Sequence, residues 1–307
     1  MISIIIPLYN KEASIATALR GVLAQTYQDF EVVVVDDGST DGGAAVVETF
    51  TDPRIRLIRQ ENGGVSAARN RGIAEARGEH VAFLDADDEW MPEFLEEIAA
   101  LIVAYPECRA RATNYIFNSN GVKSPTILRK IPFTGERGVL TNYFEVASCS
   151  HPPVCSICVC IDRDLLQEIG GFPLGIKSGE DLLTWARVAV KTLWAYSLEP
   201  LAQYNVDLFS DKPGRPHDEL DYVGDALIEL LGQIEDIHIV GLKKYISHWY
   251  KMRTSVYMFQ GNVRNTWKYG VKSLRYNPYN YKVLVMMLIV LLPSKLKSSI
   301  NKRYANG

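Results

Sequence analysis

Acidic side chains follow two apolar segments of the chain, and their spacing indicates a binding site. The run Val32–Val35 is followed by Asp36 and Asp37, and the apolar segment 81–84 is followed by Asp-Ala-Asp-Asp at 85–88. Apolar, β-branched runs of this length are typical of buried strands in a parallel sheet. Open α/β sheets bind ligands outside the carboxyl ends of such strands, so both acidic groups are expected at one edge. The pattern predicts a site for a nucleotide, a divalent cation, or both.

The elements that must position these acids alternate through the first half of the chain. Strand-like apolar runs are separated by segments with apolar residues at helical spacing. Such alternation predicts parallel strands joined by right-handed crossovers. The expected strands are 2–7, 31–35, 55–59 and 80–84, and the expected helices are 14–25, 43–50, 64–76 and 92–105.

The alternation stops near residue 111. We expect 115–134 to be polar and turn-rich and 207–218, which contains two prolines and several charges, to be a linker or mobile loop. A largely helical tail should follow. The other expected elements are a strand at 154–161 and helices at 163–169 and 178–191.

Composition excludes several classes of protein. The 307 residues are 47% hydrophobic and carry a formal net charge of −3, which suits a globular core and lacks the basic excess of nucleic-acid-binding proteins. The five cysteines are an odd number, so we expect free thiols in a reducing compartment. The N-terminus runs directly into an expected strand, and we therefore expect no secretory signal.

Five motifs occur in one order, and together they resemble the family 2 inverting glycosyltransferases over about residues 1–205. This resemblance implies an α/β GT-A fold, which is a Rossmann-like nucleotide-binding core with a mostly parallel central sheet, plus a helical C-terminal extension. It divides the chain into a nucleotide-sugar-binding half at 1–110, an acceptor-binding half at 111–205 and the extension at 206–307. The motifs are Ser3-Ile-Ile-Ile-Pro-Leu-Tyr-Asn-Lys-Glu12, Val35-Asp-Asp-Gly-Ser-Thr-Asp41, Asn62-Gly-Gly-Val-Ser-Ala-Ala-Arg-Asn70, Phe83-Leu-Asp-Ala-Asp-Asp88 and Gly179-Glu-Asp181.

The base and ribose of a nucleotide-sugar donor need polar partners at the sheet edge. Asp37 stands at a strand end, where it can accept a hydrogen bond from a ring N–H; the alternative is capping of the next helix. By resemblance, Pro7, Tyr9 and Glu12 flank the base and ribose. Ordinary packing is the alternative for Tyr9. Asp36 is expected to hydrogen-bond the loop and hold its shape.

Asp85 and Asp87 resemble the DxD motif, in which the first acid contacts the ribose and the second a metal ion. A diphosphate leaving group favours a hard divalent cation with oxygen ligands, Mn²⁺ or Mg²⁺. Asp88 is expected to cap the following helix. Arg69 can reach the nucleotide or diphosphate, or form a structural ion pair.

Inverting transfer requires a base that takes the proton of the acceptor hydroxyl. By resemblance this base is Asp181, and the alternative is a helix N-terminal role. Glu180 is expected to support the site or to bind the acceptor. Trp185 lies one helical turn further along and either lines the acceptor pocket or packs in the core.

Two features depart from the family pattern. Where many relatives carry an Arg-x-His-like motif, this chain reads Tyr204-Asn-Val-Asp207, so a partner of the leaving diphosphate is missing or is supplied by Lys212, Arg215 or His217. A zinc site is conceivable at His151, Cys155, Cys158 and Cys160, but their spacing does not match paired CxxC knuckles. Buried thiols on a strand are the favoured interpretation.

The tail contains ten consecutive apolar residues, 283–292, with basic residues on both sides. A membrane-spanning helix needs roughly 20 such residues. The run is therefore either a core helix of a C-terminal subdomain or an interfacial anchor on an anionic bilayer.

The sequence thus predicts a glycosyltransferase that moves a sugar, most simply from a UDP-sugar, to a saccharide or lipid-linked saccharide in surface polysaccharide synthesis. Its expected place is the cytoplasmic face of the inner membrane. The rival interpretations are a nucleotidyltransferase, which would need a Gly-rich loop with a basic residue near the N-terminus, and a non-catalytic sugar-binding protein. The presence of Asp85, Asp87 and Asp181 together disfavours the second rival.

Overall fold

The computed structural model describes residues 1–206, 221–233 and 241–293. The chain forms two compact units, Met1–Val223 and Gly224–Gly307. The proposed diphosphate partners Lys212, Arg215 and His217, and the lysines beyond Pro293, lie outside the described residues.

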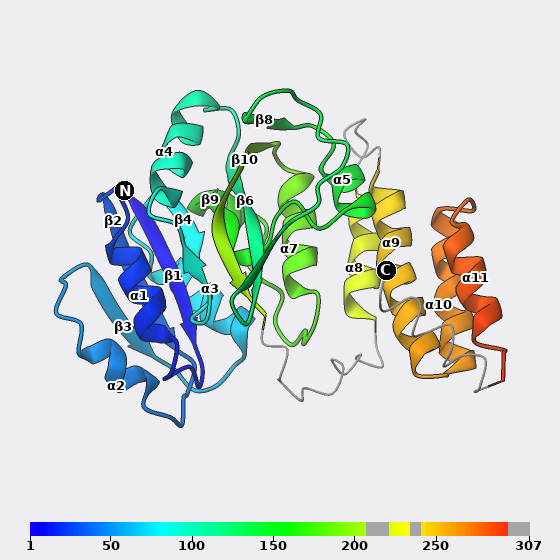
Figure 1. The fold of residues 1–307 in the computed structure, drawn as a ribbon, viewed down its shortest axis with the longest axis horizontal. Helices are drawn as coiled ribbons and strands as arrows, with labels where there is room; N and C mark the ends of the chain where they lie inside the picture. Colours follow the sequence, from blue (N-terminus) through cyan, green and yellow to red (C-terminus); the bar gives the residue numbers. More distant parts are fainter. Residues whose placement is uncertain (207–220, 234–240, 294–307) are drawn as a thin grey trace. The chain divides into compact units, whose positions relative to one another are not determined.

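A mixed sheet of ten strands forms the centre of the first unit. Its strands are β1 (Ile2–Leu8), β2 (Phe30–Asp36), β3 (Ile55–Arg59), β4 (His80–Phe83), β5 (Glu89–Trp90), β6 (Ala110–Ser119), β7 (Val122–Pro125), β8 (Arg137–Leu140), β9 (Val159–Asp162) and β10 (Trp194–Asn205). Their order is β3-β2-β1-β4-β9-β6-β10-β5, with β7 beside β6 and β8 beside β10 (Figure 1).

Seven α-helices and a 3₁₀ turn are described before the unit boundary, α8 crosses it, and three helices follow. They are α1 (Ile15–Leu23), α2 (Gly43–Glu48), α3 (Val65–Glu75), α4 (Phe94–Ala104), α5 (Tyr143–Cys149), η1 (Ser156–Cys158), α6 (Arg163–Glu168), α7 (Glu180–Ala189), α8 (Tyr222–Gly232), α9 (Leu242–Phe259), α10 (Val263–Tyr276) and α11 (Tyr281–Ile289).

The parallel half of the sheet brings three strand ends together. β1 pairs in parallel with β2 and β4, and β2 pairs in parallel with β3. The register sets Leu8 opposite Asp36 and Ile5 opposite Phe83, so the loops after β1, β2 and β4 leave the same edge. The predicted alternation of strands and helices is confirmed here. β9 enters antiparallel between β4 and β6, which makes the whole sheet mixed.

Two predicted segments differ from the structure. The segment 115–134, expected to be polar and turn-rich, begins instead with the last part of β6 and an antiparallel hairpin to β7. Its turn is Asn120–Gly121, with φ of 51° and 85°, which is the left-handed geometry that Asn-Gly hairpin turns use. The strand expected at 154–161 is only the four residues of β9, because Ser156–Cys158 form the 3₁₀ turn before it.

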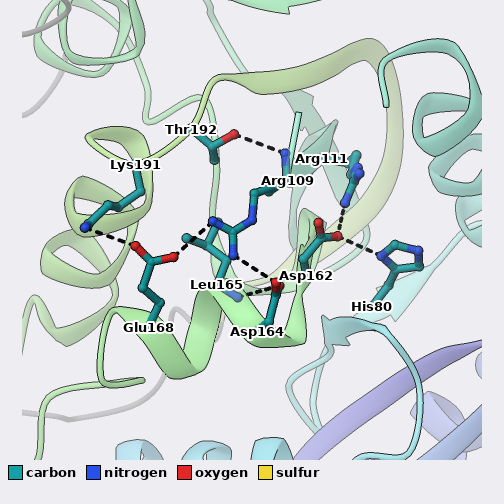
Figure 2. A network of polar contacts seen from close by, with 9 residues as sticks. All are labelled: His80, Arg109, Arg111, Asp162, Asp164, Leu165, Glu168, Lys191 and Thr192. Carbon is teal, nitrogen blue, oxygen red and sulfur yellow. Dashed lines mark hydrogen bonds and ion pairs between the residues drawn. The ribbon is translucent and has the colours of Figure 1, made fainter. Parts of the chain in front are cut away.

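The opposite edge of the sheet, where β4 begins, is held by a network of ion pairs (Figure 2). His80 Nδ1 lies 2.8 Å from Asp162 Oδ1, and the buried Arg111 pairs with the same carboxylate. Arg109 pairs with Glu168 at 3.0 Å, and Glu168 pairs with Lys191 at 3.0 Å. These contacts tie β4, β6, β9 and α6 together, and they lie at the edge away from the acids that follow β4.

The second unit has a core of its own between α9, α10 and α11. Tyr257 and Tyr269 stack at 5.3 Å, and the buried Arg253 donates to the Tyr269 hydroxyl at 3.0 Å. The side chains of the apolar run in the tail are partly buried and partly exposed. Val283 and Val290 are buried, whereas Leu284, Leu288 and Leu291 are 47%, 63% and 56% exposed. Among the helices that the structure describes, none is long and apolar enough to cross a bilayer.

Candidate active site

A pocket of about 320 Å³ opens at the carboxyl ends of β1, β2 and β4. This volume lies at the lower end of the range for small-molecule sites. Five of the residues predicted to bind nucleotide or metal line it, and they come from three separate motifs: Pro7, Tyr9, Asp37, Asp85 and Asp87. Their meeting follows from the parallel register, because each stands directly after or near the end of its strand.

Asp37 fixes the glycine loop that leads into α3. Its Oδ1 accepts from Gln60 Nε2 at 2.7 Å and from the Gly63 N–H at 2.9 Å, and its Oδ2 accepts from the Gly64 N–H at 2.8 Å. Gly64 has φ of +87°, a conformation that L side chains rarely adopt. Asp37 therefore does not cap α2. Asp36 accepts from the Ser39 N–H at 3.0 Å and shapes the loop as predicted.

Glu12 supports the loops and is absent from the residues that line the pocket. Its Oε2 accepts from the Gly42 N–H at 3.0 Å, and its own N–H donates to Asp41 Oδ2 at 2.9 Å. Asp41 also accepts from the Gly43 N–H at 2.9 Å, which satisfies a donor in the first turn of α2. Tyr9, in contrast, is 48% exposed and has its ring available at the pocket.

The two acids of the DxD motif are paired with different cations. Arg69 Nη2 donates to Asp85 Oδ1 at 2.8 Å, so the ion-pair interpretation of Arg69 is the one the structure supports. Burial alone would lower the pKa of Arg69, but the carboxylates of Asp85, Asp181 and Glu180 raise it overall. Asp87 pairs with Lys11, a residue that also lines the pocket and that sequence reasoning missed.

The sequence suggested that Asp88 caps the following helix, but the structure shows that it does not. It is 3% exposed, and its Oδ1 accepts from the Asn205 N–H at 2.7 Å. The Asn205 side chain donates to the Asp87 carbonyl at 2.7 Å. Burial, together with the charges of Asp85 and Asp87, raises the pKa of Asp88 to about 9. Asn205 belongs to the segment 204–207 that departs from the family pattern, and its hydrogen bonds hold Asp87 and Asp88 in place.

Asp181 and Glu180 form the first turn of α7, after Gly179 with φ of +86°. Asp181 is partly exposed and accepts from the N–H of Leu182 at 2.8 Å. Glu180 lies 3.9 Å from Arg69 Nη1, so the predicted supporting role has a physical partner. Arg69 therefore lies between the acids after β4 and the first turn of α7.

Comparison with known proteins identifies the family of the chain. Residues 3–170 match the family model described as Glycosyl transferase family 2, which is more than half of the chain. The chain belongs to glycosyl transferase family 2.

Several relatives share part of the length of the chain. The putative teichuronic acid biosynthesis glycosyltransferase TuaG of Bacillus subtilis is 30% identical over 212 residues, which cover 67% of this chain and 79% of TuaG. Glycosyltransferase GlyA of Streptococcus pneumoniae is 40% identical over 121 residues, or 39% of this chain. The chain spans 17% of GlyA and 30% of the uncharacterized glycosyltransferase YibD of Escherichia coli.

Solved structures share the fold of the chain. S. aureus TarS 1-349 in complex with UDP-GlcNAc has a TM-score of 0.73 at 20% identity, covering 98% of this chain and 91% of that one. The mannosyltransferase PcManGT from Pyrobaculum calidifontis, in complex with GDP-Man and Mn²⁺, has a TM-score of 0.55 at 20% identity, covering 94% and 85%. The predicted GT-A fold class is thereby confirmed.

Trp185 belongs to the core of the glycosyltransferase and not to a pocket wall. Its side chain is completely buried and packs against Phe83, Phe172 and Trp194, with ring centroids 6.4, 5.5 and 6.2 Å away. The sequence left both interpretations open because the i, i+4 spacing places Trp185 on the same face of the helix as Asp181 without saying what covers it.

The residues considered for zinc are engaged elsewhere. Cys155 and Cys158 have their sulfur atoms 3.6 Å apart, and His151 Nδ1 accepts from the Ile127 N–H at 2.9 Å. Cys160 pairs with Arg111 between β9 and β6, and burial raises the pKa of its thiol to about 12. Buried thiols, the interpretation favoured from the sequence, describe Cys158 and Cys160.

The pocket carboxylates fit a hard divalent cation that arrives with a phosphate ligand. Among the described residues, no three His, Cys, Asp or Glu side chains are grouped to hold a metal ion by themselves. Mg²⁺ and similar ions are commonly held by one or two carboxylates and completed by substrate phosphates and water. Asp87 offers a carboxylate of this kind, and in the structure it pairs with the ammonium group of Lys11.

Proposed function

We propose that this glycosyltransferase moves one sugar from a nucleotide diphosphate donor, a UDP-sugar, to a hydroxyl group of a saccharide or lipid-linked saccharide, with inversion at the anomeric carbon. One observation carries the proposal. Asp37, Asp85, Asp87 and Tyr9 line one pocket, and Arg69 joins its acids to the helix that bears Asp181.

The nucleotide would occupy the pocket between Tyr9 and Asp37. A carboxylate has about four acceptor positions, and three donors of the glycine loop already use Asp37, so an acceptor position remains for a ring N–H of the base. The exposed ring of Tyr9 can cover the face of the base. Asp85 would accept from the ribose.

The chemical step is a single displacement. The acceptor oxygen forms a bond to the anomeric carbon while the bond from that carbon to the diphosphate oxygen breaks, and the nucleoside diphosphate leaves with the electron pair. Asp181 would take the proton of the acceptor hydroxyl as general base. A divalent cation at Asp87, Mn²⁺ or Mg²⁺, would supply neutralisation of the charge on the leaving diphosphate.

Surface polysaccharide synthesis is the proposed setting. It is supported by the description of TuaG as a putative teichuronic acid biosynthesis glycosyltransferase. The donor class is supported by the UDP-GlcNAc complex of TarS, whose fold this chain shares.

Contact with the cytoplasmic face of an anionic membrane is part of the proposal. Leu284 and Leu288 are exposed on α11 and Leu291 is exposed just after it, and Lys268 and Lys282 are exposed in the same unit. A short apolar surface with basic neighbours can enter the headgroup region without crossing the bilayer.

Thermal shift of the full chain with UDP-, GDP- and dTDP-sugars, with and without Mn²⁺, tests the donor assignment. A UDP-sugar at 100 times its Kd should stabilise the fold by about 2.7 kcal/mol. Product analysis separates the rivals, since a nucleotidyltransferase would release pyrophosphate and a sugar-binding protein would give no product. No stabilisation by any nucleotide sugar would overturn the proposal.

A further inference from the structure

Lys11 and Arg69 pair with the two acids of the same motif under very different conditions. The Arg69 side chain is 4% exposed, lies over the Phe172 ring at 5.1 Å and is close to Glu180 as well as Asp85. The side chains of Lys11 and Asp87 are 36% and 41% exposed. One cation is therefore enclosed by protein, whereas the other is open to solvent and to the pocket.

The Lys11 ion pair is suited to exchange. Lysine carries a compact, well-hydrated charge on a flexible stem, and exposed ion pairs contribute little to stability. Lys11 enters from the loop after β1 and lines the pocket together with Asp37 and Asp87. A diphosphate bound in that pocket would bring new negative charge within reach of the same ammonium group.

We propose that Lys11 is an exchangeable counter-ion that couples metal binding to nucleotide binding. Before the donor arrives, Lys11 neutralises Asp87, and a divalent cation must displace it. When a diphosphate is present, Lys11 moves from the Asp87 carboxylate to the phosphate oxygens, and Asp87 becomes available to the metal ion. This inference rests on the proposed function, because it uses the same pocket and the same diphosphate.

Cooperative binding follows from this exchange. Each ligand removes an obstacle to the other, so Mn²⁺ should strengthen UDP binding and UDP should strengthen Mn²⁺ binding by the same factor. Among the described residues, no three metal-binding side chains are grouped together. A metal ion therefore depends on phosphate oxygens to complete its ligands, which points the same way.

Calorimetric titration of the full chain with Mn²⁺, in the absence and presence of UDP, tests the exchange. Lys11→Met keeps the length of the side chain and removes its charge. Without UDP it should bind Mn²⁺ about 5-fold more tightly than wild type, and the gain in Mn²⁺ affinity on adding UDP should shrink by about 5-fold or more. Lys11→Arg should retain the coupling. Lys123 is exposed on β7, and Lys123→Met should match wild type in both titrations.

The outcomes distinguish a failure of the Lys11 exchange from a failure of the proposed function. If wild type binds UDP with Mn²⁺ but Lys11→Met shows unchanged Mn²⁺ affinity and unchanged coupling, the exchange is wrong and the proposed function stands. If wild type binds neither UDP nor Mn²⁺, the proposed function fails and the exchange fails with it. Thermal melting of each variant confirms that the compared proteins are folded.

Discussion

Arg69 Nη2 lies 2.8 Å from Asp85 Oδ1, and the same guanidinium group lies 3.9 Å from Glu180 Oε1. The contact joins the end of β4 to the first turn of α7. Because the Arg69 side chain is 4% exposed, its charge depends on these carboxylates and on the Phe172 ring. The acids on the donor side and the proposed base are thus held relative to each other by one buried cation.

Asp85→Asn should destabilise the protein more than Asp87→Asn does. Loss of the Asp85 charge leaves the buried Arg69 poorly compensated, at a cost of about 3 kcal/mol. Asp87 pairs with an exposed lysine, so its replacement should change the unfolding free energy by about 0.5 kcal/mol or less. Urea unfolding followed by tryptophan fluorescence measures both. Equal losses would show that Arg69 does not rely on Asp85.

Asp181→Asn should abolish most turnover while leaving the donor bound. An amide keeps the size and the hydrogen bond of the carboxylate but takes no proton at neutral pH, so kcat should fall by about 10²-fold with little change in donor affinity. Glu180→Gln is the matched control and should be milder, because Glu180 acts through Arg69. Near wild-type kcat in Asp181→Asn would assign the base elsewhere.

The network opposite the active site predicts a pH-dependent stability. Burial alone would raise the pKa of Asp162, but the His80 hydrogen bond and the Arg111 charge lower it below its ordinary value of 3.8. A carboxyl group with a lowered pKa stabilises the fold above its unfolded pKa, and this contribution is lost as pH falls through the folded pKa.

Asp162→Asn should therefore lose about 2 kcal/mol at pH 7, because Arg111 is left buried without its partner. The difference from wild type should narrow as pH falls below 3.8. Asp164→Asn is the control, since its side chain is 76% exposed, and it should cost less than about 1 kcal/mol. Urea unfolding at several pH values provides the comparison. A constant difference at all pH values would contradict the role given to Asp162.

The exposed face of α11 predicts binding to anionic vesicles. Wild type should co-sediment with vesicles that contain anionic lipid, and less so as salt rises. Leu288→Glu should weaken binding by about tenfold, because a leucine that would enter the membrane interface is replaced by a charge. Val103→Glu, at an apolar position 82% exposed on α4, should leave binding unchanged. Absence of wild-type binding at low salt would place the face outside any membrane contact.

Local sequence patterns were sufficient for the first half of the fold. Val32–Val35 is a fully buried run, and its acids lie at the sheet edge, as parallel strands require. The β6–β7 hairpin was missed although Asn120–Gly121 is a strong hairpin signal, because polar residues in β7 masked the strand pattern. Expected helix ends moved by a few residues, which is common where caps are weak.

Contacts between distant parts of the chain account for the rest. The sequence around Asp87 does not predict its contact with Lys11, and the sequence around Asp88 does not predict its contact with Asn205. Both contacts hold the segment 85–88 in place. Lys11 and Asn205 both belong to segments that the sequence analysis identified. Their positions could therefore be predicted, but their contacts could not. Trp185 was ambiguous for the same reason, since its neighbours Phe83 and Phe172 come from other elements.

The anomeric configuration of the first-formed product decides whether transfer inverts the anomeric carbon. The donor is an α-linked UDP-sugar identified by thermal shift. Proton NMR should follow its reaction with a panel of simple glycoside acceptors in the presence of Mn²⁺. Asp181→Asn should serve as the inactive control. We expect UDP release coupled to a β-linked product, both lost on adding EDTA and restored by Mn²⁺. An α-linked product, or full activity in excess EDTA, would contradict it.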